Sequence, residues 1–117
     1  MQQELNKSPY PHVNCANDLT NALMKRAEFK GFERKTIGAN AIRAGIMMQP
    51  KRNWLRFIPG LGRKLVPQVG DRHWRAINLE FEAIGRDYDT ASMTPRFDVN
   101  KKENTIEIEF KAKYHGR

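Results

Sequence analysis

The chain of 117 residues has one cysteine, Cys15, and no apolar run near the roughly 20 residues needed to span a bilayer. A lone cysteine cannot form an internal disulfide, and nothing near it resembles a metal site or the base that activates a nucleophile. The expectation is therefore a reduced, cytosolic origin. The first seven residues lack a basic head followed by an apolar stretch, which argues against a secretion signal.

Apolar residues are also somewhat scarce, at 39% of the chain, whereas charged residues make up 29%. The length fits one domain. A hydrophobic core can form, but not a large one. We therefore expect part of the chain to become ordered only when it binds a partner.

Acidic residues are nearly absent from the middle of the chain, although the net charge of +8 is moderate overall. Residues 50–75 contain seven basic residues against Asp71 alone. These are Lys51, Arg52, Arg56, Arg63, Lys64, Arg72 and Arg75. Most of the positive charge is thus a local patch and not a basic tail.

Patterns typical of catalysis or metal binding are missing. The three histidines are scattered, without ligand spacing. Glu80 and Glu82 point away from each other on a helix, so they cannot flank one scissile bond. No serine or cysteine lies in a nucleophile elbow. We therefore expect a protein that is not an enzyme and that uses no cofactor or metal.

The clearest structural signal is the alternation of apolar and polar residues over residues 105–114. Residues 92–99 also alternate, and residues 100–104 form a polar turn, so the sequence predicts a β-hairpin of 92–99 with 105–114. One face is apolar, and the other is an ordinary charged, solvated face. In a second interpretation, the hairpin has a functional role, because its outer edge can accept a strand from a partner protein. The polar-face residues that would lie there are Thr105, Glu107, Glu109, Lys111 and Lys113.

Three helices are predicted before the hairpin. Residues 1–16, which include two prolines, are expected to form an extended arm, with a first helix at 17–27. A second helix opens at Thr36 and ends at Pro50, weakened by Gly38 and Gly45. The third spans 71–88. Its apolar face packs across the hairpin and consists of Trp74, Ile77, Phe81, Ile84 and Tyr88.

These elements give a small α+β domain over residues 17–117, with three helices on an antiparallel β-hairpin or small sheet. Between the second and third helices lies an irregular basic loop that also holds Trp54 and Phe57. Such a loop can bind nucleic acid through phosphates and stacked bases, or it can face an acidic protein partner. Its basic residues are Lys51, Arg52, Arg56, Arg63 and Lys64.

In its order of elements the chain resembles the small baseplate wedge subunit of contractile phage tails, a family shared with type VI secretion baseplates. Four segments carry the resemblance: the helix expected at 40–48, the turn at 58–65, the helix pattern of 76–88 and the strand at 104–110. The family's Glu-Pro-Arg motif matches either residues 89–91 or residues 94–96. The phenylalanine of its turn is replaced here by Leu61.

The resemblance implies a structural protein with a fold like the interlocking domain of sheath subunits. It would link the core bundle of the wedge to the first sheath ring and seed sheath assembly. The wedge contact would fall on Asp89, Thr94, Pro95 and Arg96. Residues 105–113 would pair with sheath, and the basic loop would face acidic neighbours.

The implied partners are other wedge proteins, the sheath and the tail tube, in a hetero-oligomer assembled in the host cytoplasm and found in the virion tail baseplate. Membrane and nucleic acid are not expected among them. The alternative is a small basic nucleic-acid-binding module that uses residues 51–64. A third interpretation is a solitary soluble α+β domain with an unidentified partner.

Overall fold

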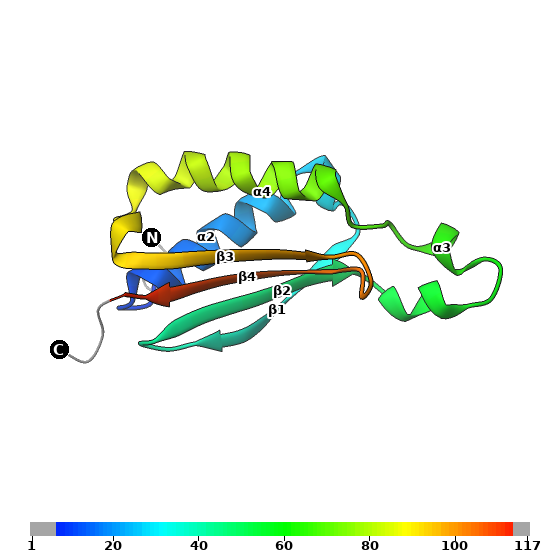
Figure 1. Cartoon of the computed structure of the whole chain (residues 1–117), viewed down its shortest axis with the longest axis horizontal. Helices are drawn as coiled ribbons and strands as arrows, with labels where there is room; N and C mark the ends of the chain where they lie inside the picture. The colour runs from blue at the N-terminus through cyan, green and yellow to red at the C-terminus, as the bar shows by residue number, and fades with distance from the viewer. Residues whose placement is uncertain (1–6, 114–117) are drawn as a thin grey trace.

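The computed structural model describes residues 7–113, which form an α+β domain with helices on one face of a four-stranded antiparallel sheet (Figure 1). The main elements are α2 (Pro11–Met24), β1 (Phe32–Ala39), β2 (Arg43–Pro50), α3 (Gly62–Leu65), α4 (Asp71–Ile84), β3 (Met93–Asn100) and β4 (Thr105–Ala112). Short 3-10 turns connect them: η1 (Ala27–Phe29), η2 (Asn53–Phe57), η3 (Gly85–Asp87) and η4 (Thr90–Ser92).

The sheet consists of two hairpins placed side by side, in the strand order β1-β2-β4-β3. The predicted C-terminal hairpin is confirmed, as β3 pairs antiparallel with β4, with Phe97 opposite Ile108. Residue 114 lies outside the described residues. The other side of β4 pairs with β2, which places Ile46 opposite Ile108. The two halves of the chain therefore meet at the centre of the sheet.

The helix predicted for residues 36–48 is wrong, because this segment is a second β-hairpin. Ala44, Ile46 and Met48 are buried on one face of β2. They are spaced two residues apart, as on a strand, although the apolar residues of this segment also fit a helical spacing. Gly38 and Gly45, which weaken a helix, lie opposite each other across the two strands. At the turn, the Asn40 side chain accepts hydrogen bonds from the backbone N–H groups of two following residues.

The predicted arm is also shorter than expected, because α2 begins at Pro11 and not at Asn17. Proline is favoured in the first turn of a helix, where its missing N–H costs nothing. Val13, Cys15 and Ala16 are buried, so residues 11–16 belong to the domain. The third helix ends at Ile84, and η3 continues the chain toward Tyr88.

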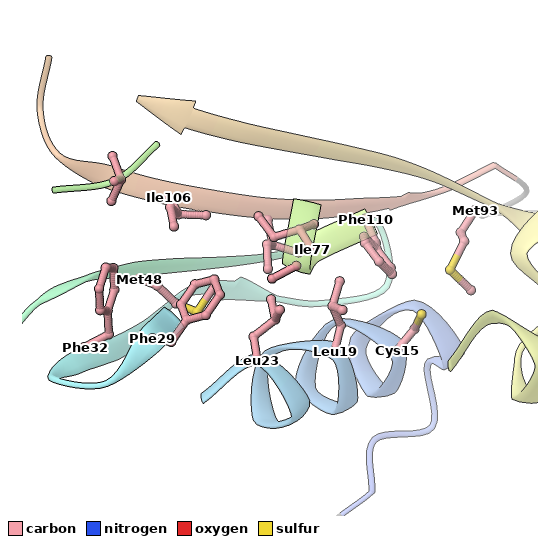
Figure 2. Close-up of a cluster of buried hydrophobic side chains, with 13 residues drawn as sticks. Cys15, Leu19, Leu23, Phe29, Phe32, Met48, Ile77, Met93, Ile106 and Phe110 are labelled. Atoms are coloured by element: carbon pink, nitrogen blue, oxygen red, sulfur yellow. The ribbon is translucent and has the colours of Figure 1, made fainter. Parts of the chain in front are cut away.

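The core lies between the sheet and the two long helices. Leu19 and Leu23 of α2, Ile77 of α4, and Ile106 and Phe110 of β4 point into it (Figure 2). The apolar face predicted for the third helix does pack on the hairpin, where Phe81 meets Phe97 and Phe110 edge to face. These apolar faces explain why both helices lie on the same side of the sheet.

Cys15 belongs to this core and is fully buried. Burial, aided by the negative charge of Asp18, raises the pKa of its thiol to about 12. The thiol is therefore protonated and inert near neutral pH, as expected for a packed cysteine.

Two polar clusters join α4 to the segment that follows α2. Gly70 N–H donates to Nδ1 of the buried His73, and Nε2–H of the same ring donates to the Glu28 carbonyl at 2.9 Å. Beside them, the Arg26 guanidinium pairs with the carboxylates of Glu28 at 3.0 Å and Glu80 at 2.8 Å. Together these contacts fix the start and one side of α4 against η1.

Candidate functional site: a basic lobe

The connection from β2 to α4 projects beyond the end of the sheet, at the right of Figure 1, and contains η2 and α3. We call residues 51–68 the basic lobe. Loops longer than about 12 residues are uncommon in small domains and usually serve a function. The five basic residues predicted for this loop, from Lys51 to Lys64, all lie in the lobe.

Asn104 anchors both ends of the lobe to the turn between β3 and β4. Its buried carboxamide accepts a hydrogen bond from Val69 N–H at 2.8 Å and donates to the Pro67 carbonyl at 2.9 Å. It also donates to the side chain of Asn53, at the start of η2, at 3.0 Å. Both chain segments at the base of the lobe are thus tied to one residue.

Close backbone packing fixes the shape inside the lobe. Gly62 N–H donates to the Ile58 carbonyl at 2.8 Å. A Cβ at position 62 would lie 2.0 Å from the Arg56 carbonyl oxygen, so only glycine fits there. Gly60 has a φ of +80°, which also favours glycine. The lobe therefore has a defined conformation despite its lack of long helices or strands.

The lobe exposes large apolar side chains that the body of the domain does not cover. The exposed fraction is 65% for Trp54, 71% for Phe57 and 59% for Leu61. Ile58 and Leu65 are exposed as well. A concentration of exposed apolar groups on one projecting segment is typical of an interaction surface.

Beside these residues lies a pocket of about 360 Å³ with a strongly positive lining. Of the residues described, those that line it are Arg56, Phe57, Arg63, Gln68, Lys101 and Lys102. We call it the cation-lined pocket, since four of its six residues are basic and none is acidic. The Arg56 guanidinium stacks over the Phe57 ring at 4.5 Å and donates to the Lys102 carbonyl.

The sequence did not identify Lys101 and Lys102 as part of this site. They belong to the turn between β3 and β4, more than 30 residues beyond the loop. The polar turn itself was predicted, but its position beside the loop follows from the β2–β4 pairing and from Asn104. No local pattern carries that information.

The residues assigned to a wedge contact lie at the opposite end of the domain. Asp89 precedes η4, and Thr94, Pro95 and Arg96 follow on β3; all four are exposed. The start of β3 is far from the lobe, as Figure 1 shows. Lys113 N–H donates to the Ser92 carbonyl, so by the alternation of the ladder Pro95 has its nitrogen on the free edge of β3.

The strand-exchange edge predicted at residues 105–113 is wrong. β4 lies between β2 and β3, so neither of its edges is free. Glu107 and Glu109 lie on the solvated face of the sheet, where the Glu109 carboxylate pairs with Arg43 at 2.7 Å and Arg96 at 3.5 Å. These charged residues therefore pair with one another across the strands on the solvated face of the sheet. The free edges of the sheet belong to β1 and β3.

Within residues 7–113, no three His, Cys, Asp or Glu side chains come close enough to hold a metal ion. The two histidines in this range are engaged: His73 as described above, and His12 through Nε2–H, which donates to the Asn40 carbonyl at 2.7 Å. His115 lies outside the described residues. Of the helices described, none has the length and apolar character to cross a membrane.

Comparison with known protein families, with curated proteins and with solved structures found no match for this chain.

Proposed function

We propose that this chain is a non-enzymatic structural subunit that links neighbouring proteins, and that its assembly is the baseplate wedge of a contractile tail, as the resemblance implies. The exposed apolar and basic side chains of the basic lobe carry the proposal. They are the groups through which a protein docks, and they sit on a backbone already held by Asn104 and Gly62. A surface ordered before binding loses less conformational entropy when it docks.

The shape of the domain supports a linking role. It measures 53 × 27 × 25 Å, with the basic lobe at one end and the start of β3 toward the other (Figure 1). The start of β3 carries the exposed residues Thr94, Pro95 and Arg96. In this proposal Arg96 meets the core bundle of the wedge and the lobe meets the sheath. The likeness to the sheath interlocking domain remains part of the proposal.

Two corrections change how the sheath would be met. Residues 40–48 form a turn and a strand where the family has a helix, so this segment no longer supports the resemblance. With β4 inside the sheet, an exchanged strand cannot be added there. A proline at Lys111 would break pairing within the sheet of the domain itself, because Lys111 lies opposite Thr94 of β3. The contact with sheath therefore moves from β4 to the basic lobe.

The test is a pulldown of the tagged protein from its native lysate after nuclease treatment, read by mass spectrometry. We expect wedge and sheath proteins with the wild type, and loss of sheath with Leu61→Ser. Leu79→Ser is the matched control, because Leu79 is equally exposed but lies on α4. Tail proteins absent from the wild-type sample would contradict the baseplate assignment.

A nucleic-acid-binding module is the second candidate, and the exposure of Trp54 and Phe57 beside basic residues favours it. Aromatic side chains can stack on bases while Arg and Lys contact phosphates. This candidate predicts affinity for single strands that falls steeply with salt. It gives no role to the exposed aliphatic residues Leu61 and Leu65.

A further inference from the structure

We infer that the basic lobe binds an acidic amphipathic helix of a partner protein, with apolar side chains on the lobe and a carboxylate in the cation-lined pocket. The inference rests on the proposed function only in taking the lobe as a docking surface. It adds the chemistry of the segment that docks there, whichever assembly the partner belongs to.

The apolar part of the surface requires an apolar partner. Leu61 and Leu65 are four residues apart across the single turn of α3, a spacing that places side chains on one side of a helix. Both are about half exposed or more, and Phe57 is more exposed still. Aliphatic side chains gain nothing from a phosphate backbone, but they are buried well by Leu, Ile or Phe on one face of a partner helix.

The cation-lined pocket requires negative charge on the same partner helix. In the described residues around the cation-lined pocket, the one acid paired with a lining cation is Asp71, which lies 3.6 Å from Lys101. Both side chains of that pair are more than two-thirds exposed, so water and salt screen it strongly. Arg63 and Lys102 also line the pocket, and the Arg56 guanidinium, which donates one N–H to the Lys102 carbonyl, has further N–H groups that can hydrogen-bond a carboxylate.

The two parts are close enough for one segment to meet both. Phe57 belongs to the apolar surface and also lines the pocket. Arg63 lines the pocket and stands between Leu61 and Leu65 in the chain. An amphipathic helix with acids flanking its apolar stripe presents both chemistries at this spacing.

Other occupants fit less well. A second copy of this chain would bring a net charge of +8 and another basic lobe to the same place, so charge opposes association through the lobe. An anionic bilayer presents a flat layer of headgroups, whereas the pocket lies between two separate segments, the lobe and the β3–β4 turn. Single-stranded nucleic acid leaves the aliphatic residues uncovered.

The test measures binding of labelled probes to the full-length protein by fluorescence anisotropy. The main probe is a peptide of about 18 residues with Leu and Phe along one helical face and Glu elsewhere. A scrambled peptide of the same composition, an oligothymidine and phosphatidylserine vesicles complete the set. We expect the amphipathic peptide to bind at least about 10-fold tighter than the scrambled one, since only it offers a continuous apolar stripe.

Variants locate the site. Leu61→Ser and Arg63→Glu should each weaken binding of the amphipathic peptide by about 10-fold or more. Leu79→Ser and Arg86→Glu are matched controls that lie on α4 and η3, and they should leave it unchanged. Equal binding of the two peptides, tighter binding of oligothymidine or vesicles, or no peptide binding would each overturn the inference.

The outcomes separate this inference from the proposed function. Peptide binding without tail proteins in the pulldown would reject the baseplate and keep the helix-binding lobe. A different outcome would be that Leu61→Ser loses sheath in the pulldown while the two peptides bind equally well. That outcome would keep the baseplate role and reject an acidic helix as the segment that docks on the lobe.

Discussion

The side chain of Asn104 accepts a hydrogen bond from the backbone N–H of Val69 at 2.8 Å, and this bond ties the end of the basic lobe to the β3–β4 turn. Asn104 also has a φ of +59°, a left-handed conformation that asparagine tolerates better than most residues. One buried residue thus shapes the turn and holds the lobe.

Replacement of Asn104 should separate these two roles. Asn104→Gly keeps the left-handed backbone but leaves the buried Val69 N–H without its partner, which should cost about 1–3 kcal/mol in the free energy of unfolding. Asn104→Ala should cost about 1–2 kcal/mol more than Asn104→Gly, because alanine tolerates the left-handed conformation less well than glycine or asparagine. Urea denaturation measures both. Asn78→Ala, on the exposed face of α4, should change stability by less than about 0.5 kcal/mol. Equal stability of Asn104→Ala and the wild type would contradict this role.

Gly62→Ala should deform the lobe while the sheet and helices stay folded. The new Cβ would fall 2.0 Å from the Arg56 carbonyl oxygen, a backbone atom that cannot move without opening η2. We expect faster proteolysis between residues 51 and 68, and loss of binding of the amphipathic peptide. Gly70→Ala is the control, because a Cβ there meets nothing within 4 Å. An unchanged cleavage pattern in Gly62→Ala would show that the lobe lacks the close packing described.

The free energy of unfolding should fall as the pH drops below about 6.5, the usual pKa of a histidine. Burial lowers the pKa of His73, and both ring nitrogens are already engaged in the neutral form. Protonation is therefore easier in the unfolded chain, whose histidines titrate near about 6.5. The stabilising contribution is complete above about pH 6.5 and is lost as the pH falls toward the lower folded pKa.

Urea denaturation between about pH 7.5 and 5.5 measures this loss. His73→Gln should reduce the slope of stability against pH, even though the variant is less stable at neutral pH. A slope unchanged by that substitution would assign the effect to other groups. Direct titration of the His73 ring by NMR provides a second reading, and a folded pKa above about 6.5 would contradict the prediction.

Arg26→Ala should raise the pKa of Glu28. The paired guanidinium of Arg26 is the main reason that this pKa stands at about 2, with a backbone hydrogen bond adding to the effect. Without Arg26 the carboxyl should titrate closer to the usual value of about 4.3. NMR titration of the glutamates measures the shift. Lys25→Ala, which removes a neighbouring exposed cation, should leave Glu28 unchanged.

The sequence predicted the elements whose apolar residues follow a single period. Thr105 through Ala112 alternates strictly, and Trp74 through Ile84 follows helical spacing, and both appear as expected. Residues 36–48 fit both periods. The buried set Ala44, Ile46 and Met48 belongs to a strand, and the helical interpretation gave too little weight to β-branched residues and to paired glycines.

The candidate site was predicted in part, for reasons that can be named. The basic and aromatic residues of the lobe were visible in the chain, but alternation reports only which face of a strand is buried. It says nothing about which edge is paired, so the interior position of β4 could not be foreseen. The contributions of Lys101, Lys102 and Asn104 depend on contacts between distant segments.

The interior position of β4 also has a consequence for the order in which the protein can fold. Among the described strands β4 comes last in sequence, yet it separates β2 from β3 and completes both pairings. Until residue 112 has left the ribosome, β2 presents an unpaired inner edge, and the apolar faces of α2 and α4 lack the core side chains Ile106, Ile108 and Phe110. Folding of this domain must therefore wait until β4 has been synthesised, and chains truncated before Thr105 should aggregate and not fold.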